Sequence, residues 1–229
     1  MAELHPLYDK KTTCTICQHT FYTKQIRSRF LRIKKYDTDF FIHYENEQLN
    51  PLFYHVHICP KCGYASTEQF STVFPPKTIE LIRQKVCAHW VYQPYEKERS
   101  INQAVNTYKL ALYCATLKRE KPTLMGNLTL RLGWLYRILQ NKQQEEHFLL
   151  HSLKFYTNAY VQESFSRTAT ELRLLYLIGE LNYRLGFSQE AVKYFSEIIY
   201  KHKQHPDKKT FELTKDRWSE IRQEQKHLL

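Results

Sequence analysis

Two cysteine pairs decide the fold of this chain: Cys14-Thr-Ile-Cys17, and Cys59-Pro-Lys-Cys62 followed by Gly63. Two residues between the cysteines let one tight turn bring both sulfur atoms to the same ion. Four thiolates at the corners of a tetrahedron are a ligand set that zinc prefers. Gly63 suits such a turn because glycine adopts positive φ without steric cost. We therefore predict one structural Zn²⁺ site formed by Cys14, Cys17, Cys59 and Cys62.

Other interpretations of the cysteines stay open. The 41 residues between Cys17 and Cys59 exceed the usual zinc-ribbon spacing, so an inserted hairpin is needed. Disulfides or redox chemistry are disfavoured, because no secretory segment precedes the pairs and no βαβ context surrounds them. His19, His55 and His57 could replace a cysteine, although four thiolates already complete the tetrahedron. Such a site also accepts iron.

The composition indicates a globular protein of one large or two small domains. Hydrophobic residues make up 42% of the 229 residues, enough for a packed core, and five glycines are too few for a loop-rich chain. We interpret Cys87 and Cys114, which fall in helical sequence, as small buried apolar residues. No apolar stretch approaches the roughly 20 residues of a membrane span, and the N-terminus shows no targeting segment. We expect a soluble, cytoplasmic protein without a membrane partner.

The N-terminal part is predicted to be a small β module. Residues 1–13 are interpreted as a polar lead-in, and residues 14 to about 70 as an antiparallel sheet held together by the metal. Pro75-Pro76 marks a change to helical periodicity. The predicted domains are therefore residues 1–74, a zinc-ribbon-like module, and residues 75–229, a helical domain.

A run of positive residues between Lys24 and Lys35 has two interpretations. It could be a basic strand that contacts phosphates or an acidic partner. It could also be the solvated face of an edge strand, where positive side chains prevent aggregation. We favour the second, because acidic residues follow at once. The positive residues are Lys24, Arg27, Arg29, Arg32, Lys34 and Lys35.

The second part of the chain has the apolar period of about seven α-helices. Ile79, Ile82, Val86 and Trp90 lie on one face of the first, and a stripe beginning at Phe165 marks the fifth. The predicted boundary signals are a capping box at Ser100 and Gln103, a break at Lys121-Pro122, Asn141, a C-terminal cap at Gly186 and a cap at Ser188.

The fifth and sixth helices also carry a repeat pattern. Ile178-Gly179, Gly186, Ala191 and Phe195 stand at the spacings of a tetratricopeptide repeat, in which small residues let paired helices approach closely. Leu132-Gly133 repeats the first half of the pattern, with a period of about 40–45 residues. The sequence thus predicts a mainly α protein: the β module, then a short tetratricopeptide-like solenoid closed by a capping helix.

The whole chain resembles the bacterial family grouped as domain of unknown function 2225. The motifs that carry this resemblance are Cys14-Thr-Ile-Cys17, Asp39-Phe40, Asn50-Pro51 with Tyr54, and Cys59-Pro-Lys-Cys62-Gly63-Tyr64-Ala65. The resemblance implies a bacterial, cytoplasmic protein whose four cysteines form one site. It implies no particular activity.

Three functions follow from these features. Stacked helical hairpins present a groove that holds peptides, so we expect a protein-interaction adaptor, and the net charge of +11 suits an acidic partner. The alternative is nucleic-acid binding through the basic run of the zinc module. We expect no enzymatic activity, because four cysteines leave a zinc ion no open position and no phosphate loop, HExxH or GxSxG pattern occurs.

Overall fold

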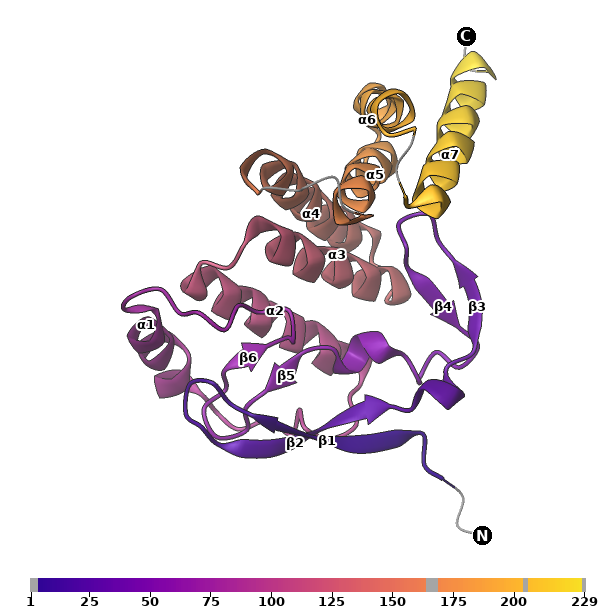
Figure 1. Ribbon diagram of the computed structural model, residues 1–229. Helices are drawn as coiled ribbons and strands as arrows, with labels where there is room; N and C mark the ends of the chain where they lie inside the picture. Colours follow the sequence, from indigo (N-terminus) through magenta and orange to yellow (C-terminus); the bar gives the residue numbers. More distant parts are fainter. Residues whose placement is uncertain (1–3, 164–168, 204–205, 228–229) are drawn as a thin grey trace.

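The computed structural model describes residues 4–163, 169–203 and 206–227. Within these ranges, three short β-hairpins are followed by seven α-helices (Figure 1). The predicted fold class, a small antiparallel β module followed by a mainly α chain, is confirmed. The assignment of the helices to the tetratricopeptide family stays a prediction.

Each hairpin is a separate two-stranded antiparallel sheet, where one small sheet was predicted. The pairs are β1 (Leu7–Thr13) with β2 (Thr20–Ile26), β3 (Ile33–Tyr36) with β4 (Ile42–Tyr44), and β5 (His57–Ile58) with β6 (Ala65–Ser66). The prediction that residues 1–13 form a polar lead-in is wrong, because Leu7–Thr13 form strand β1. Its side chains alternate between more and less buried positions, but only Leu7 and Tyr8 are apolar, so the sequence carries no clear strand signal.

The basic run is not one strand. Lys24 belongs to β2, a short 3-10 turn at Ser28–Phe30 follows, and β3 begins only at Ile33. Pairing of β2 stops at Ile26 because its partner β1 begins at Leu7. The positive side chains are therefore shared between two hairpins.

The helices are α1 (Thr78–Lys85), α2 (Ile101–Lys118), α3 (Pro122–Ile138), α4 (Lys142–Gln162), α5 (Ala169–Arg184), α6 (Ser188–Lys201) and α7 (Lys208–His227). The predicted capping box is present: the Ser100 hydroxyl accepts from the Gln103 amide at 3.3 Å, and the Gln103 side chain accepts from the Ser100 amide at 2.8 Å. Asn141 caps α4 in the same manner, through the Gln144 amide.

Two predicted helix boundaries differ in detail from the structure, and a third lies outside the described residues. The first helix ends at Lys85, and a 3-10 turn at Cys87–His89 separates it from Trp90. Ser188 is the first residue of α6, and the N-cap position predicted for it is occupied by Phe187, which makes no side-chain capping hydrogen bond. Phe165, the predicted start of the fifth stripe, lies outside the described residues.

Successive helices from α2 to α7 pack against one another in a layered stack (Figure 1). Glycines permit the close pairs: a Cβ on Gly133 would lie 2.8 Å from a Leu149 methyl carbon in α4, and one on Gly179 would lie 2.7 Å from Phe195 Cε1 in α6. Gly186 ends α5 with a φ of +86°. Helix α7 packs on α5 and α6, at the position predicted for a capping helix.

One cluster of buried side chains joins the β module to the first helices. It runs from Leu7 to Phe148 and includes the paired cysteines together with the inner faces of α2 and α3. Tyr108 of α2, fully buried, donates a hydrogen bond to the Leu52 carbonyl at 3.1 Å. The predicted domain boundary at residue 74 stays a prediction. The cluster of buried side chains contains residues from both sides of it.

The tip of the β3–β4 hairpin contacts helices α3 and α5 and lies near the start of α7 (Figure 1). Asp39 at this tip is completely buried. Its carboxylate accepts hydrogen bonds from the Arg137 guanidinium at 2.7 and 3.1 Å and from the Trp134 indole at 3.0 Å. Next to it, Tyr176 of α5 donates to the Thr38 carbonyl at 2.9 Å. The hairpin is thus fastened to the inner side of the stack.

The charge of Asp39 contributes to stability in a pH-dependent manner. Burial alone would raise the pKa of this carboxyl, but the hydrogen bonds and charge of Arg137, with Arg184 and Trp134, hold it below its usual value. A carboxyl whose pKa is lower in the folded than in the unfolded chain stabilises the fold above the unfolded value of about 3.9. That contribution is lost as the pH falls through the lower, folded pKa.

We predict that Asp39→Ala lowers the free energy of unfolding by about 3 kcal/mol, because the Arg137 guanidinium and the Trp134 indole lose their buried acceptor. Arg137 keeps Asp37 and Glu145 as partners, which places the cost at the lower end of the range for buried pairs. Urea unfolding at pH 7 measures it. The matched control is Glu146→Ala, whose carboxylate is exposed and 3.8 Å from Lys142. Equal stability of the two variants would contradict the role of Asp39.

Candidate metal centre

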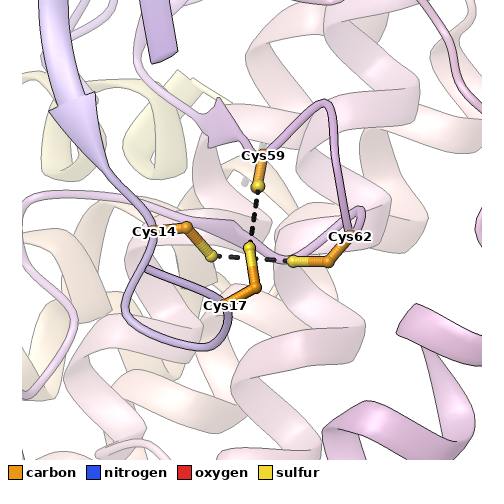
Figure 2. Close-up of side chains that lie close together, drawn as sticks. All are labelled: Cys14, Cys17, Cys59 and Cys62. Carbon is orange, nitrogen blue, oxygen red and sulfur yellow. Dashed lines mark hydrogen bonds between the residues drawn. The ribbon is translucent and has the colours of Figure 1, made fainter. Parts of the chain in front are cut away.

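The four paired cysteines meet at one place (Figure 2). Cys14 and Cys17 come from the turn between β1 and β2, and Cys59 and Cys62 from the turn between β5 and β6. All four Sγ atoms lie within 4.8 Å of one another. The Sγ atoms of Cys14 and Cys62 are 3.6 Å apart, and those of Cys17 and Cys59 are 3.5 Å apart.

This geometry fits a tetrahedral metal site. Metal–sulfur bonds of about 2.3 Å give a tetrahedron whose sulfur–sulfur edges are about 3.8 Å. A disulfide would require about 2.05 Å, and all four cysteines are free. A buried set of four thiols suits a thiophilic ion such as zinc or iron.

The two cysteine turns have the same backbone hydrogen bonds. In each, the first cysteine's amide donates to the carbonyl five residues on, and its carbonyl accepts from the amide four residues on. These bonds are Cys14 to His19 (2.9 Å), Gln18 to Cys14 (3.0 Å), Cys59 to Tyr64 (3.0 Å) and Gly63 to Cys59 (2.8 Å). The equivalent residues Gln18 and Gly63 both have positive φ, +59° and +73°. The expectation for Gly63 is confirmed, and Gln18 adopts the same conformation without the freedom of glycine.

The segment that includes and follows α1 holds both turns in place. The Trp90 ring packs on Gly63, where a Cβ would lie 2.4 Å from the indole, and its Nε1 donates to the Pro60 carbonyl at 2.9 Å. Arg83 of α1 donates to the Ile16 carbonyl in the first turn at 3.4 Å. Residues outside the module therefore help to position the sulfur atoms.

The thiols cannot all ionise on their own. Hydrogen bonds from Cys14 and Cys62 lower the pKa of Cys59 below its usual value, which favours its thiolate. The hydrogen bond to Cys59, with burial, raises the pKa of Cys14 to about 12, and the Cys62 pKa is raised also. A bound divalent cation would replace these shared protons and stabilise the further thiolates.

The other candidate ligands lie apart from this cluster. Among the described residues, the ligating group contains the four cysteines and none of His19, His55 and His57. Burial lowers the pKa of His57 to about 4, so its imidazole is neutral. Cys114 is buried as expected, whereas Cys87 is half-buried at the edge of the cluster, near Cys62. Its position beside the site is not evident from the sequence.

The six positive residues of the basic run differ in their surroundings. Lys24 lies 2.8 Å from Asp9, and Lys35 lies 3.8 Å from Asp37. Arg27 and Arg29 lie over the rings of Tyr8 and Phe30. Arg29, Arg32 and Lys34 are exposed.

One family model, described as "Uncharacterized protein conserved in bacteria (DUF2225)", matches residues 7–221. The chain belongs to this family. The match covers the β module, the cysteine turns and the helical stack into α7. No curated protein and no solved structure matches the chain. Among the described helices, none combines the length and the apolar character needed to cross a membrane.

The remaining motif residues of the DUF2225 resemblance have structural partners. Asp39 is the buried partner of Arg137. Asn50 caps the 3-10 turn at Pro51–Tyr54 through the Leu52 amide at 3.0 Å, and the Tyr54 hydroxyl accepts from the Arg99 amide at 3.4 Å. In the sequence, only the Asp39-Phe40 motif of the family resemblance pointed to the tip of the β3–β4 hairpin, which attaches to α3.

We predict that serine at any one of the four cysteines lowers the metal content from one ion per chain to near zero and makes residues 7–66 sensitive to protease. The reason is that metal binding and folding are coupled in small modules. The later helices keep most of the circular dichroism signal, because α4–α7 have clusters of buried side chains of their own. Elemental analysis and limited proteolysis measure both effects. Cys114→Ala is the control and retains the metal; unchanged metal content in all four serine variants would disprove the site.

Proposed function

We propose that the chain is a non-catalytic, zinc-binding adaptor that holds an acidic segment of a partner protein. The supporting observation is a pocket of about 460 Å³ between the β3–β4 hairpin and helices α5 and α7. Its apolar lining includes Tyr36, Phe40, Ile42 and Leu213, and its charged lining includes Asp37, Arg173 and Lys209. Asp37 is paired with Arg137 and Arg173 with Asp207, which leaves Lys209 as the lining cation without an ion pair among the described residues.

The chemistry of this pocket suits a short acidic peptide with one apolar side chain. Tyr36 is 61% exposed, which leaves a large ring available at the mouth. Lys34 and Lys35 of the adjoining strand are exposed, and the whole chain carries a net charge of +11. Positive potential of this kind attracts and orients acidic partners.

The pocket differs from an open solenoid groove. The tip of the β3–β4 hairpin already covers part of the inner side of α3 and α5, through Asp39 and Thr38. A partner segment would therefore bind beside this hairpin instead of along an empty row of helices. Recognition would combine residues from the β module and from the end of the helical stack.

Zinc is proposed as the metal in a purely structural role. Four thiolates complete its coordination and leave no position for a substrate or an activated water molecule. Cysteine ligands stay available to a metal ion where thiols remain reduced, which suits the bacterial cytoplasm.

We predict that random 12-residue peptides selected on the purified protein are enriched in Asp and Glu around one Phe or Leu. Lys209→Glu is expected to weaken a selected peptide at least about tenfold, because one attractive contact becomes repulsive. Lys208→Glu is the matched control: it makes the same change in the first turn of α7 but lies outside the pocket lining. Equal affinity of the two variants, or selection without acidic enrichment, would overturn the proposal.

Nucleic-acid binding is the second candidate. Arg29, Arg32 and Lys34 are exposed and close in sequence, and the exposed ring of Tyr36 lies in the same strand as Lys34. Phosphate contacts and ring stacking are the two elements of single-strand binding.

We predict that any such binding weakens steeply as salt rises, and that replacing these three basic residues by glutamine reduces the slope of log affinity against log salt by about two for single strands. Fluorescence anisotropy with a labelled oligonucleotide measures it. Lys201→Gln, Lys203→Gln and Lys208→Gln in one chain make the control for net charge. Absent or salt-insensitive binding would remove this candidate and leave the adaptor proposal untouched.

A further inference from the structure

A second pocket lies on the other side of the same hairpin, between β4, the 3-10 turn at Pro51–Tyr54 and helix α3. Its volume is about 320 Å³, within the range of small-molecule sites. Its lining includes the rings of Phe40, Phe41, Tyr44, His55 and Trp134 and the guanidinium-bearing side chain of Arg131.

Arg131 is the unusual residue of this pocket. It is half-buried on α3, and its hydrogen bond within the described chain goes from Nη1 to the Asn127 carbonyl at 3.1 Å. No described carboxylate lies within 4 Å of its guanidinium nitrogens. Burial raises the pKa of both Tyr108 and Tyr156, and the charge of Arg131 opposes that rise. Its positive potential therefore reaches the surrounding side chains.

Neighbouring arginines are neutralised, which makes Arg131 an exception. The paired arginines are Arg137 with Asp39 at 2.7 Å, Arg184 with Glu180 at 2.8 Å and Arg217 with Glu180 at 2.8 Å. Arg99, which is more deeply buried, donates to the carbonyls of Tyr95, Phe53 and Val56. Among the described residues, Arg131 has no comparable set of acceptors. Most of its guanidinium N–H groups are therefore available to a ligand.

The rest of the lining adds ring faces and one neutral polar group. Phe41 and Trp134 are tilted partners with centroids 5.7 Å apart. His55 is kept neutral, because burial and the charges of Arg131 and His57 lower its pKa to about 3, against a small opposing effect of Glu68. Its Nε2 is buried and has no hydrogen-bond partner in the described residues.

From these features we propose that this pocket binds a small organic acid, in which a carboxylate or phosphate group is attached to a flat apolar body. The acid group pairs with Arg131, whose planar donors match two oxygens at once. The body lies among the rings of Phe40, Phe41 and Trp134. The volume corresponds to on the order of ten water molecules, which suits a body of one or two rings.

The test is isothermal titration calorimetry of the metal-loaded, full-length protein with benzoate, indole-3-acetate and phenyl phosphate. Each acid is compared with its uncharged amide or alcohol. We expect saturable binding of at least one acid and at least tenfold weaker binding of its neutral counterpart. Arg131→Gln should reduce the affinity at least tenfold, and Arg131→Lys should retain part of it. Arg222→Gln, an exposed arginine outside the pocket, is the matched control and should change nothing.

The relative affinities of the carboxylates and phenyl phosphate identify the preferred acid group. Circular dichroism and metal content verify that Arg131→Gln is folded. Binding that is unaffected by Arg131→Gln, equal binding of neutral counterparts, or no binding of any acid at 10 mM would each overturn the proposal. Lys209→Glu, in the other pocket, should leave acid binding unchanged, so this proposal and the adaptor proposal fail separately.

Discussion

The β module depends on one constraint: four sulfur atoms from two distant turns must meet within 4.8 Å. The 41 residues between Cys17 and Cys59 form a loop whose closure costs conformational entropy, and β5 and β6, at two residues each, offer few hydrogen bonds in return. A metal ion bound by the four thiolates would supply the missing free energy, since structural zinc is worth about 10–16 kcal/mol in small peptides. The two cysteine turns, each with a residue at positive φ, then have to do no more than place their sulfur atoms around the ion.

The buried carboxylate of Asp39 provides a second attachment, which the metal cannot supply. It fixes the β3–β4 hairpin to α3, and the contacts at Arg137 and Trp134 compensate the cost of removing a charge from water. The same contacts stabilise the next residue, Phe40, in a left-handed conformation with a φ of +68°, which is unfavourable for an aromatic side chain. The Phe40 ring lies 5.2 Å from the Tyr176 ring, so packing on α5 contributes as well.

Much of the helical part could be predicted, because its signals are local. The helix period, the capping box at Ser100 and the glycine at Gly186 each act within a few residues. The gathering of the cysteines was also predictable, since the spacing within each pair follows from metal geometry. Strand β1 was missed because an alternation of half-buried and exposed polar residues resembles a loop. The Asp39–Arg137 pair joins residues 98 positions apart, and no local pattern reports such a contact.

The hairpin tip also explains why two pockets with basic linings lie side by side in a protein that contains many acidic residues. Phe40 and Ile42 line both pockets, one on each side of the hairpin. Two carboxylates behind the hairpin, Asp39 and Glu180, are completely buried and neutralised by arginines of the helical stack. Asp37 lines the larger pocket and lies 3.0 Å from Arg137. Arg173 is paired with Asp207, so the positive charge without an ion pair among the described residues comes from Lys209 in one pocket and Arg131 in the other. A structure that uses its carboxylates internally to join two parts leaves surfaces at the junction that favour anions, and this is the physical basis for assigning acidic ligands to both pockets.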